Sequence, residues 1–483
     1  MCSDLGIDSA IVRIALDQPV VNLSDSFKAY DVRGIEDQTL NDDAATAIGF
    51  AFVEVTDAQT VLVGGDMRPS SEQYVQAFTR GAVAAGADVV QLGLISTDML
   101  YHASGVLKAP GVVFTASHNP AGYNGMKLTR AGAVPISADS GLADIQRIAQ
   151  CHLNAGFIES VATPGTVRTQ DTLPDYASYL RSLVDLSSIR PLKVVVDAGN
   201  GMAGYTTPAV LGDKVLPKLP VEIIPLYFEL DGTFPNHPAN PIEPANLVDL
   251  QAAVREHEAD LGLAFDGDAD RCFVVDERGE PISPSAITAM VAVREIARAQ
   301  DAGETTPVII YNLITSKVVP EVVEAAGGRA IKTRVGHSFI KAYMAEHQAI
   351  FGGEHSAHYY FRDFFNADTG MLAAMHVLAM LGATQATASE LAAEYSPYVA
   401  SGEINSRVDD QAAAIARVLA EFDPGVETVV TTLDGTTVEA ADGSWWFNIR
   451  PSNTEPLLRF NAEAPDTATM EWLRDSVLAI IRA

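Results

Sequence analysis

The sequence has few cysteines and a shortage of positive charge. Its three cysteines, Cys2, Cys151 and Cys272, are odd in number and match no disulfide, metal or redox spacing, so we expect a protein of the reducing cytoplasm. Lys and Arg number 32 against 62 Asp and Glu, which gives a formal net charge of -30. Phosphate groups repel such a surface, which argues against nucleic acid and anionic membranes as partners.

Long apolar runs are also lacking. No uncharged apolar stretch reaches the ~18 residues that a membrane-spanning helix needs, so no membrane partner is expected. Asp4 and Asp8 stand where a signal peptide would carry basic residues. A chain of 483 residues exceeds the usual size of one hydrophobic core and therefore predicts three or four domains.

Three segments share one local plan, beginning at Thr60, Lys193 and Pro307. Each has an apolar β-branched run, a polar or glycine turn, and then helical spacing. Short, uniformly apolar strands followed by helices predict sheets covered on both faces. From about Ser401 the strands alternate, and a final helix carries an apolar stripe. Its residues are Met470, Leu473, Val477 and Ile480.

The predicted fold class is α/β, with three similar domains built on mixed or parallel sheets and a smaller C-terminal α+β domain. The expected parts are a loosely attached leader over 1–22, α/β domains over 23–166, 167–278 and 279–400, and the α+β domain over 401–483.

Ser117 lies in the segment TASHNP, directly after the apolar run GVVF. A strand ending there places the serine at the carboxyl edge of a sheet, where ligands bind in α/β proteins. A nucleophilic serine needs an activating group. The adjacent His118 does not establish one, because neighbours in sequence need not face each other. An ordinary polar turn is the alternative.

Asp266, Asp268 and Asp270 alternate along DGDADR after the apolar run LGLAF. Carboxylates spaced in this way can converge on one hard cation such as Mg²⁺. An EF-hand loop would need glycine in place of Arg271 and a helix before it. The motif also fits a haloacid-dehalogenase-type phosphatase poorly, since Asp270 stands at its fifth position. A solvated acidic turn is disfavoured because three unpaired carboxylates repel one another.

Two further turns offer polar groups. Glu354 and Ser356 in GEHSAH supply an acceptor and a donor that suit sugar hydroxyls, although a helix N-cap fits equally well. The turn RPSNTEP supplies guanidinium, hydroxyl and backbone N–H groups that suit phosphate, although a plain hairpin turn would look similar. Its polar residues are Arg450, Ser452, Asn453 and Thr454.

The segment Gly199–Gly204 fits the dinucleotide-binding pattern GxGxxG, with Glu229 and Asp231 near the place of a ribose-binding acid. A dinucleotide site would leave the serine, aspartate and arginine turns unexplained. We therefore interpret this segment as a tight strand–helix turn.

Taken together, the motifs resemble the α-D-phosphohexomutase family, and most closely its phosphomannomutase/phosphoglucomutase branch. The resemblance covers nearly the whole chain, and TASHNP followed by DGDADR is specific as a pair. In family order the motifs are FKAYDVRG from Phe27, TASHNP, NGMK ending at Lys127, DAGNGMAG, DGDADR, VGHS around His337, GEHSAH and RPSNTEP.

This resemblance implies four domains around a central cleft and a phosphoryl group carried on Ser117. It implies that Ser117, Asp266, Asp268 and Asp270 bind Mg²⁺, and that a hexose 1,6-bisphosphate primes the enzyme. The implied catalytic residues are Ser117, His118, Lys127, Arg33, Arg271 and His337, of which Lys127 or His337 assists proton transfer. The implied substrate-binding residues are Tyr30, Glu354, Ser356, Arg450, Ser452, Asn453 and Thr454.

The activity implied is interconversion of mannose 6-phosphate and mannose 1-phosphate by a monomer or weak homodimer, with glucose or glucosamine phosphates as alternative substrates. Two departures from the branch bear on substrate choice. Ala357 stands where the branch commonly has glycine, and Ile314 where relatives place a lysine, with Lys317 close by. Outside this class, a serine-dependent phosphatase, a non-catalytic phosphosugar-binding protein and a nicotinamide-dependent dehydrogenase are the alternatives.

Overall fold

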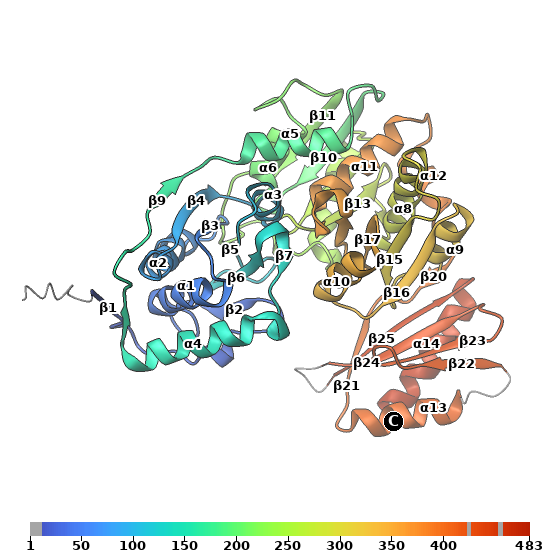
Figure 1. Ribbon diagram of the computed structural model, residues 1–483. Coiled ribbons are helices and arrows are strands. Elements are labelled where there is room, and N and C mark those ends of the chain that lie inside the picture. Colours follow the sequence, from blue (N-terminus) through green and yellow to red (C-terminus); the bar gives the residue numbers. More distant parts are fainter. Residues whose placement is uncertain (1–11, 423–426, 453–456) are drawn as a thin grey trace, which may run out of the picture. The chain divides into compact units, whose positions relative to one another are not determined.

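The structure is a computed structural model that describes residues 12–422, 427–452 and 457–483 (Figure 1). Internal contacts divide it into two compact units. The first comprises Met1–Glu280 with Asp363–Gln385, and the second comprises Pro281–Arg362 with Ala386–Ala483. The first unit contains two α/β sheets, and the second contains one α/β sheet and one antiparallel sheet. This architecture confirms the predicted fold class.

The three α/β sheets share one strand order. Four strands recur in each sheet. The first of them along the chain lies in the middle, the second on one side of it, the third on the other side, and the fourth runs antiparallel beside the third. In the first sheet of the first unit these strands are, in sheet order, β4 (Asp88–Leu94), β3 (Thr60–Gly65), β5 (Gly111–Phe114) and β6 (Tyr123–Arg130). In its second sheet they are β11 (Val221–Leu226), β10 (Leu192–Asp197), β12 (Leu261–Phe265) and β13 (Cys272–Asp276). The second unit has β16 (Arg329–Thr333), β15 (Val308–Asn312), β17 (Phe351–Gly353) and β18 (Tyr359–Phe361).

The first sheet carries further strands at its edges, which are β2 (Val32–Ile35), β7 (Val134–Pro135) and β9 (Val167–Thr169). Because β9 pairs with β4, the expected boundary at residue 166 lies too early. The expected leader also needs correction. Strand β1 (Arg13–Ala15) pairs with β8 (Phe157–Glu159), and Leu16 and Val21 are buried in the first core, so residues 13–22 belong to this domain.

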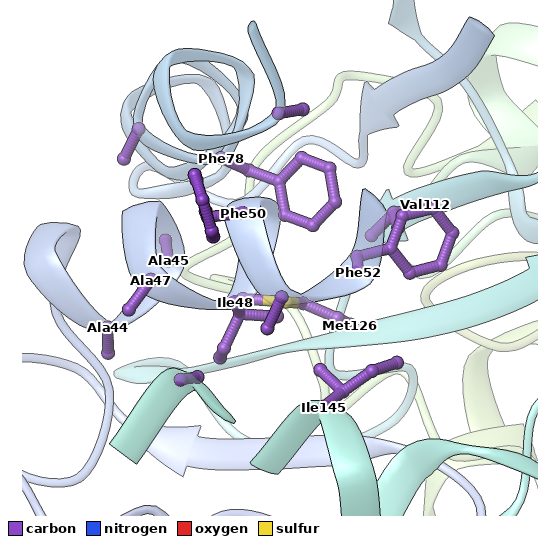
Figure 2. Packing of buried hydrophobic residues seen from close by; sticks show 14 of the residues in the cluster. Ala44, Ala45, Ala47, Ile48, Phe50, Phe52, Phe78, Val112, Met126 and Ile145 are labelled. Carbon is purple, nitrogen blue, oxygen red and sulfur yellow. The ribbon is translucent and has the colours of Figure 1, made fainter. Parts of the chain in front are cut away.

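Helices cover both faces of the first sheet. One face bears α1 (Asp42–Thr56), α2 (Ser71–Ala84) and α4 (Leu142–Ala155), and the other bears α3 (Thr97–Leu107). Figure 2 shows the first core, where Ile48 and Phe52 of α1 lie beside Val112 and Met126 of the sheet. The rings of Phe52 and Phe78 of α2 are 5.7 Å apart.

The second sheet of the first unit is accompanied by α5 (Leu173–Leu183), α6 (Ala203–Val210) and α7 (Val248–Glu256). The unit also includes β19 (Ala367–Asp368) and α11 (Gly370–Gly382), which packs on β13. The contacts of residues 363–385 group this segment with the first unit, and the apolar α11 buries nearly all its residues. The range 279–400 expected for the third domain, which includes this segment, stays a prediction.

In the second unit, α8 (Pro284–Asp301) packs on α9 (Val318–Ala325) and β17, and α10 (His337–His347) packs on β15. The remaining elements before residue 401 are β14 (Pro281–Ile282), α12 (Ala388–Ala393) and β20 (Val399–Ala400). The antiparallel sheet has the order β20-β25-β24-β23-β22, with β21 beside β25. Its own strands and helices are β21 (Ile404–Arg407), α13 (Gln411–Glu421), β22 (Thr428–Thr431), β23 (Thr436–Ala440), β24 (Trp446–Pro451), β25 (Leu457–Ala464) and α14 (Thr467–Arg482).

The predicted apolar stripe lies on α14. Met470, Leu473 and Val477 are buried, but Ile481 takes the fully buried place expected for Ile480, one turn beyond Val477. Among the helices that the structure describes, none combines the length and apolar character that a membrane span requires.

Glycines let α1 and α2 touch through their backbones. A Cβ on Gly81 would lie 1.9 Å from the Thr46 carbonyl oxygen, and one on Gly49 would lie 2.2 Å from that of Phe78. We expect Gly81→Ala to overpack this contact by about 2 kcal/mol and to lower the thermal midpoint of the first unit by about 4–8 °C. Arg80→Ala, an exposed neighbour on α2, is the control and should shift the midpoint little. Equal midpoints for the two variants in calorimetry would contradict the backbone contact.

Candidate active site

Ser117 lies in the turn between β5 and β6, three residues after β5 ends. It is 3% exposed and has a left-handed backbone with φ 50°. Its N–H donates to Thr115 Oγ1 at 2.9 Å, which holds the turn. A non-glycine residue in this conformation costs about 1–2 kcal/mol, and such strain concentrates at functional sites.

The serine and aspartate loops meet, although 149 residues separate Ser117 from Asp266. Ser117 Oγ donates to Asp266 Oδ2 at 2.8 Å. Gly267 permits this approach, because a Cβ there would lie 2.4 Å from the Ser117 carbonyl oxygen. The structure thus brings the predicted nucleophile and the predicted metal ligands into one site within the first unit.

Asp266, Asp268 and Asp270 are fully buried and can each offer one oxygen within 4.8 Å of the others. Asp268 Oδ1 is buried with no hydrogen-bond partner in the part of the chain that the structure describes. Buried carboxylates are costly unless a cation neutralises them, and an oxygen-only ligand set suits a hard divalent ion. The loop is therefore an acidic metal-binding cluster.

Two cations contact this cluster directly. Lys127 Nζ lies 2.6 Å from Asp268 Oδ2 and 2.5 Å from Asp270 Oδ2, and Arg271 Nε donates to Asp266 Oδ2 at 2.9 Å. Burial alone would lower the pKa of Lys127, but the charges of Asp268 and Asp270 raise the pKa well above its usual value. Burial raises the pKa of Asp266 to about 7, against the lowering effect of Arg271.

Arg33 on β2 adds a third cation near the serine. Its Nε donates to Asp31 Oδ2 at 2.8 Å and its Nη1 donates to Asn119 Oδ1 at 2.7 Å. These two bonds hold the guanidinium against the serine turn. Tyr30, three residues earlier, lies half-buried before β2.

His118 is held as a neutral acceptor. Its Nδ1 accepts from Arg271 Nη2 at 2.6 Å and lies 3.2 Å from Ser117 Oγ. Burial, together with the positive charges of Arg271 and Arg33, lowers the pKa of His118 to about 2. A ring nitrogen that already accepts from a guanidinium is poorly placed to take the serine proton.

Arg68 was missed by the sequence analysis, although it follows the carboxyl end of β3 just as Ser117 follows β5. Its guanidinium is buried and lies 3.4 Å from Asp66. It donates four hydrogen bonds, at 2.6–3.0 Å, to backbone carbonyls of the serine turn. These belong to Ser117, Asn119, Pro120 and Tyr123. Arg68 thus holds the strained turn in its conformation through these four hydrogen bonds.

The GxGxxG segment supports the metal loop. The Met202 N–H donates to the Gly267 carbonyl at 2.9 Å. A Cβ on Gly201 would lie 2.7 Å from the Gly267 carbonyl oxygen, so the glycine is needed for close packing. This contact explains the glycine pattern without a dinucleotide, in agreement with the strand–helix turn expected from the sequence.

In the second unit, Glu354 is buried at the end of β17. Its carboxylate accepts from Asn312 Nδ2 at 3.0 Å, Gly336 N at 3.3 Å and Tyr360 Oη at 2.7 Å. Glu354 therefore ties the GEHSAH turn to the VGHS segment. His337 begins α10, and its side chain lies outside the described residues.

Ala357 is one of the two departures from the branch, and its backbone is left-handed. It has φ 64° and is fully buried in the GEHSAH turn beside the half-buried Ser356. Glycine adopts this conformation without strain, so the alanine costs about 1–2 kcal/mol of backbone energy.

Arg450 lies at the end of β24, close to two carboxylates. Its Nη2 is 3.4 Å from Glu403 Oε2 and its Nη1 is 3.9 Å from Asp434 Oδ2. Ser452 follows β24, and its N–H donates to the Leu457 carbonyl at 2.9 Å. Asn453 and Thr454 lie outside the described residues.

The second departure concerns Ile314, which packs with Leu313, Val335 and Trp446 in an apolar cluster. Lys317, which is close by in the sequence, makes other contacts. Its ammonium donates to the Gly443 carbonyl and lies 4.6 Å over the Tyr398 ring.

Comparison with known proteins identifies the family. The sequence matches phosphoglucomutase/phosphomannomutase alpha/beta/alpha domains I, II and III over residues 24–153, 174–279 and 284–398, and the C-terminal domain over 403–480. It is 40% identical to a phosphomannomutase of Escherichia coli over 460 residues, which cover 94% of this chain and 99% of that protein. The chain belongs to this family.

Other members agree with the assignment. A phosphomannomutase of Vibrio cholerae is 38% identical over 91% of this chain and 94% of its own, and the phosphohexose mutases of Xanthomonas campestris pv. campestris are 40% identical over 95% and 99%. A phosphoglucomutase/phosphomannomutase family protein from Burkholderia thailandensis has the same fold, with a TM-score of 0.82 and 31% identity over 95% of this chain and 97% of that one. The chain is a mutase of the isomerase class, acting on a hexose phosphate.

Because His118 stays neutral, we expect it not to set the pH dependence of this family member. His118→Asn keeps a side-chain acceptor for Arg271, and kcat/KM between pH 5 and 8 should keep the acidic limb of the parent enzyme. The measurement is a pH profile of both proteins. A limb displaced by about one unit or more in His118→Asn would mean that the histidine titrates during the reaction.

Proposed function

We propose that this chain interconverts mannose 6-phosphate and mannose 1-phosphate through a phosphorylated Ser117. The observation that carries the proposal is the 2.8 Å contact between Ser117 Oγ and Asp266 in a buried site that also contains Lys127 and Arg271. The relatives named phosphomannomutase support mannose as the preferred sugar. Phosphohexose mutases among the relatives support glucose phosphates as additional substrates.

The reaction has two transfers. In the first, a sugar hydroxyl attacks the phosphorus of phosphoserine, the bond from phosphorus to Ser117 Oγ breaks, and the hydroxyl proton passes to a base. The product is a bound hexose 1,6-bisphosphate. In the second, Ser117 Oγ attacks the other phosphate, and the released sugar oxygen takes up a proton. Unphosphorylated enzyme therefore needs hexose 1,6-bisphosphate as primer.

Positive charge is the main requirement of this chemistry. Phosphoserine carries about -1.5 to -2 charges at pH 7, so an anionic substrate would be repelled. Mg²⁺ held by Asp266, Asp268, Asp270 and the phosphate of Ser117 would supply Lewis-acid stabilisation of the phosphoryl oxygens. Arg33 and Arg271 are the guanidinium donors for the moving group. Lys127 and His337 are our candidates for proton transfer. Lys127 is an ammonium held by two carboxylates and is therefore suited to donate the proton that the released sugar oxygen takes up.

We assign substrate contacts to Tyr30 and, for the sugar hydroxyls, to Glu354 and Ser356 of the GEHSAH turn. The residues that we assign to the phosphate that does not react are Arg450, Ser452, Asn453 and Thr454. Arg450 lies near Glu403 and Asp434, so a phosphate would have to compete with two carboxylates for its guanidinium. We propose a cytoplasmic enzyme, monomeric or weakly dimeric, without a nucleic-acid or membrane partner.

Replacing the nucleophile tests the covalent route. We expect Ser117→Ala to lose turnover by about 10³-fold or more, because the variant lacks the oxygen that carries the phosphoryl group in this route. Intact and peptide mass spectrometry should find one phosphate at residue 117 of the parent protein and none in the variant. Ser178→Ala, an exposed serine on α5, is the control and should keep both phosphate and turnover. Near-normal isomerisation by Ser117→Ala would rule out the covalent intermediate.

Substrate preference is tested by comparing kcat/KM for mannose 1-phosphate, glucose 1-phosphate and glucosamine 1-phosphate with Mg²⁺ and a bisphosphate primer. We expect mannose 1-phosphate to exceed glucosamine 1-phosphate by about tenfold or more. A preference for glucosamine 1-phosphate would overturn the sugar assignment, and release of inorganic phosphate without isomer would instead indicate a phosphatase.

A further inference from the structure

Asp98 is a buried carboxylate that belongs to none of the catalytic or binding motifs. It is 1% exposed and lies in the first turn of α3. Three hydroxyls donate to it: Ser96 Oγ at 2.5 Å to Oδ1, and Tyr176 Oη at 2.5 Å and Thr369 Oγ1 at 2.7 Å to Oδ2. No Lys, Arg or His in the described ranges lies within ion-pair distance of it.

One side of this network reaches the metal loop through α3. Thr97, the residue before Asp98, donates from Oγ1 to Asp268 Oδ2 at 2.6 Å and from its N–H to the Asp268 carbonyl at 3.1 Å. The position of Thr97 depends on where α3 starts. The hydrogen bonds that Ser96, Tyr176 and Thr369 donate to Asp98 fix this start.

The other side reaches the loop through α11. Thr369 caps α11, accepting from the Leu372 N–H at 3.2 Å while it donates to Asp98. The next residue, Gly370, packs so closely on Arg271 that a Cβ would lie 2.6 Å from the Arg271 carbonyl. Asp98 therefore joins two helix N-termini, one of which contacts Asp268 in the middle of the metal loop and the other Arg271 at its end.

A buried carboxylate without a cation is an expensive way to hold two helices together, because its desolvation is offset only by hydroxyl donors. Apolar packing would bind α3 to α11 at lower cost. Short charge-assisted bonds, by contrast, fix the direction of their partners closely. What Asp98 contributes is thus the exact placing of Thr97 and Gly370 rather than cohesion.

We propose that Asp98 is a positioning residue for the metal loop, which holds Thr97 and Gly370 in place so that the three aspartates stay convergent. This inference rests on the proposed magnesium site. Groups that orient metal ligands typically change metal affinity by 10–100-fold when they are removed.

The test measures the Mg²⁺ dissociation constant by titration calorimetry and the thermal midpoint of each variant of the full chain. Asp98→Asn puts an amide donor where hydroxyls now donate and should raise the dissociation constant by about tenfold or more. Tyr176→Phe removes one hydroxyl and should raise it less, in the same direction. In both variants, saturating Mg²⁺ should restore most of kcat, and KM for the sugar phosphate should change little.

Tyr74→Phe is the matched control. Tyr74 is another buried tyrosine of the first unit, and its hydroxyl donates at 3.0 Å to the Leu40 carbonyl. This variant should lower the thermal midpoint without changing Mg²⁺ binding. Should Asp98→Asn fail to fold, the Mg²⁺ dissociation constants of Tyr176→Phe and Tyr74→Phe are compared instead, and a weaker binding by Tyr176→Phe alone supports the proposal.

An Mg²⁺ dissociation constant for Asp98→Asn or Tyr176→Phe equal to that of Tyr74→Phe would overturn the proposal and leave Asp98 a structural residue only. Failure of the underlying site would look different. In that case the parent protein would bind no Mg²⁺, or Asp266→Ala would bind it as tightly as the parent.

Discussion

Mutual repulsion among Asp266, Asp268 and Asp270 is the constraint on which the first unit depends. The three carboxylates are buried within 4.8 Å of one another, and such a group is stable only among compensating charges and donors. Arg271 comes from the loop itself, Lys127 from β6 and Thr97 from α3, so two further elements converge on this turn.

The same position in the repeated sheet is used three times. The serine turn follows β5, the aspartate turn follows β12 and the GEHSAH turn follows β17, each between the third parallel strand and its antiparallel neighbour. Each turn contains a non-glycine residue with a left-handed backbone, which is Ser117, Ala269 or Ala357. The sharp reversal after the third strand imposes this conformation, and it brings polar groups to the edge of each sheet.

Much of this was predictable from local sequence. Apolar runs ending in polar turns predicted the strands and located Ser117, the aspartates and Glu354 correctly at strand ends. What the sequence does not encode locally is contact between distant elements. Arg68 and Asp98 act through groups far along the chain, and neither stands in a motif that marks it.

The errors have similar physical causes. Strand β9 and residues 13–22 join the first domain by pairing and burial that involve partners 70 residues or more away. Helix α11 is apolar on nearly every side, so its sequence does not indicate which unit it packs in. Residues 363–385 thus make an excursion into the first unit between two segments of the second.

The excursion of residues 363–385 has a consequence for how the chain can be divided. The polypeptide passes from one unit to the other near residues 280, 362 and 385, so three covalent connections link the units. A single proteolytic cut would leave the halves tethered. A fragment ending at residue 280 would keep Ser117 and every aspartate of the metal loop, yet it would lack the helix that closes one side of that loop. The unit that contains the metal loop is thus completed by a piece of chain that is synthesised after most of the third domain.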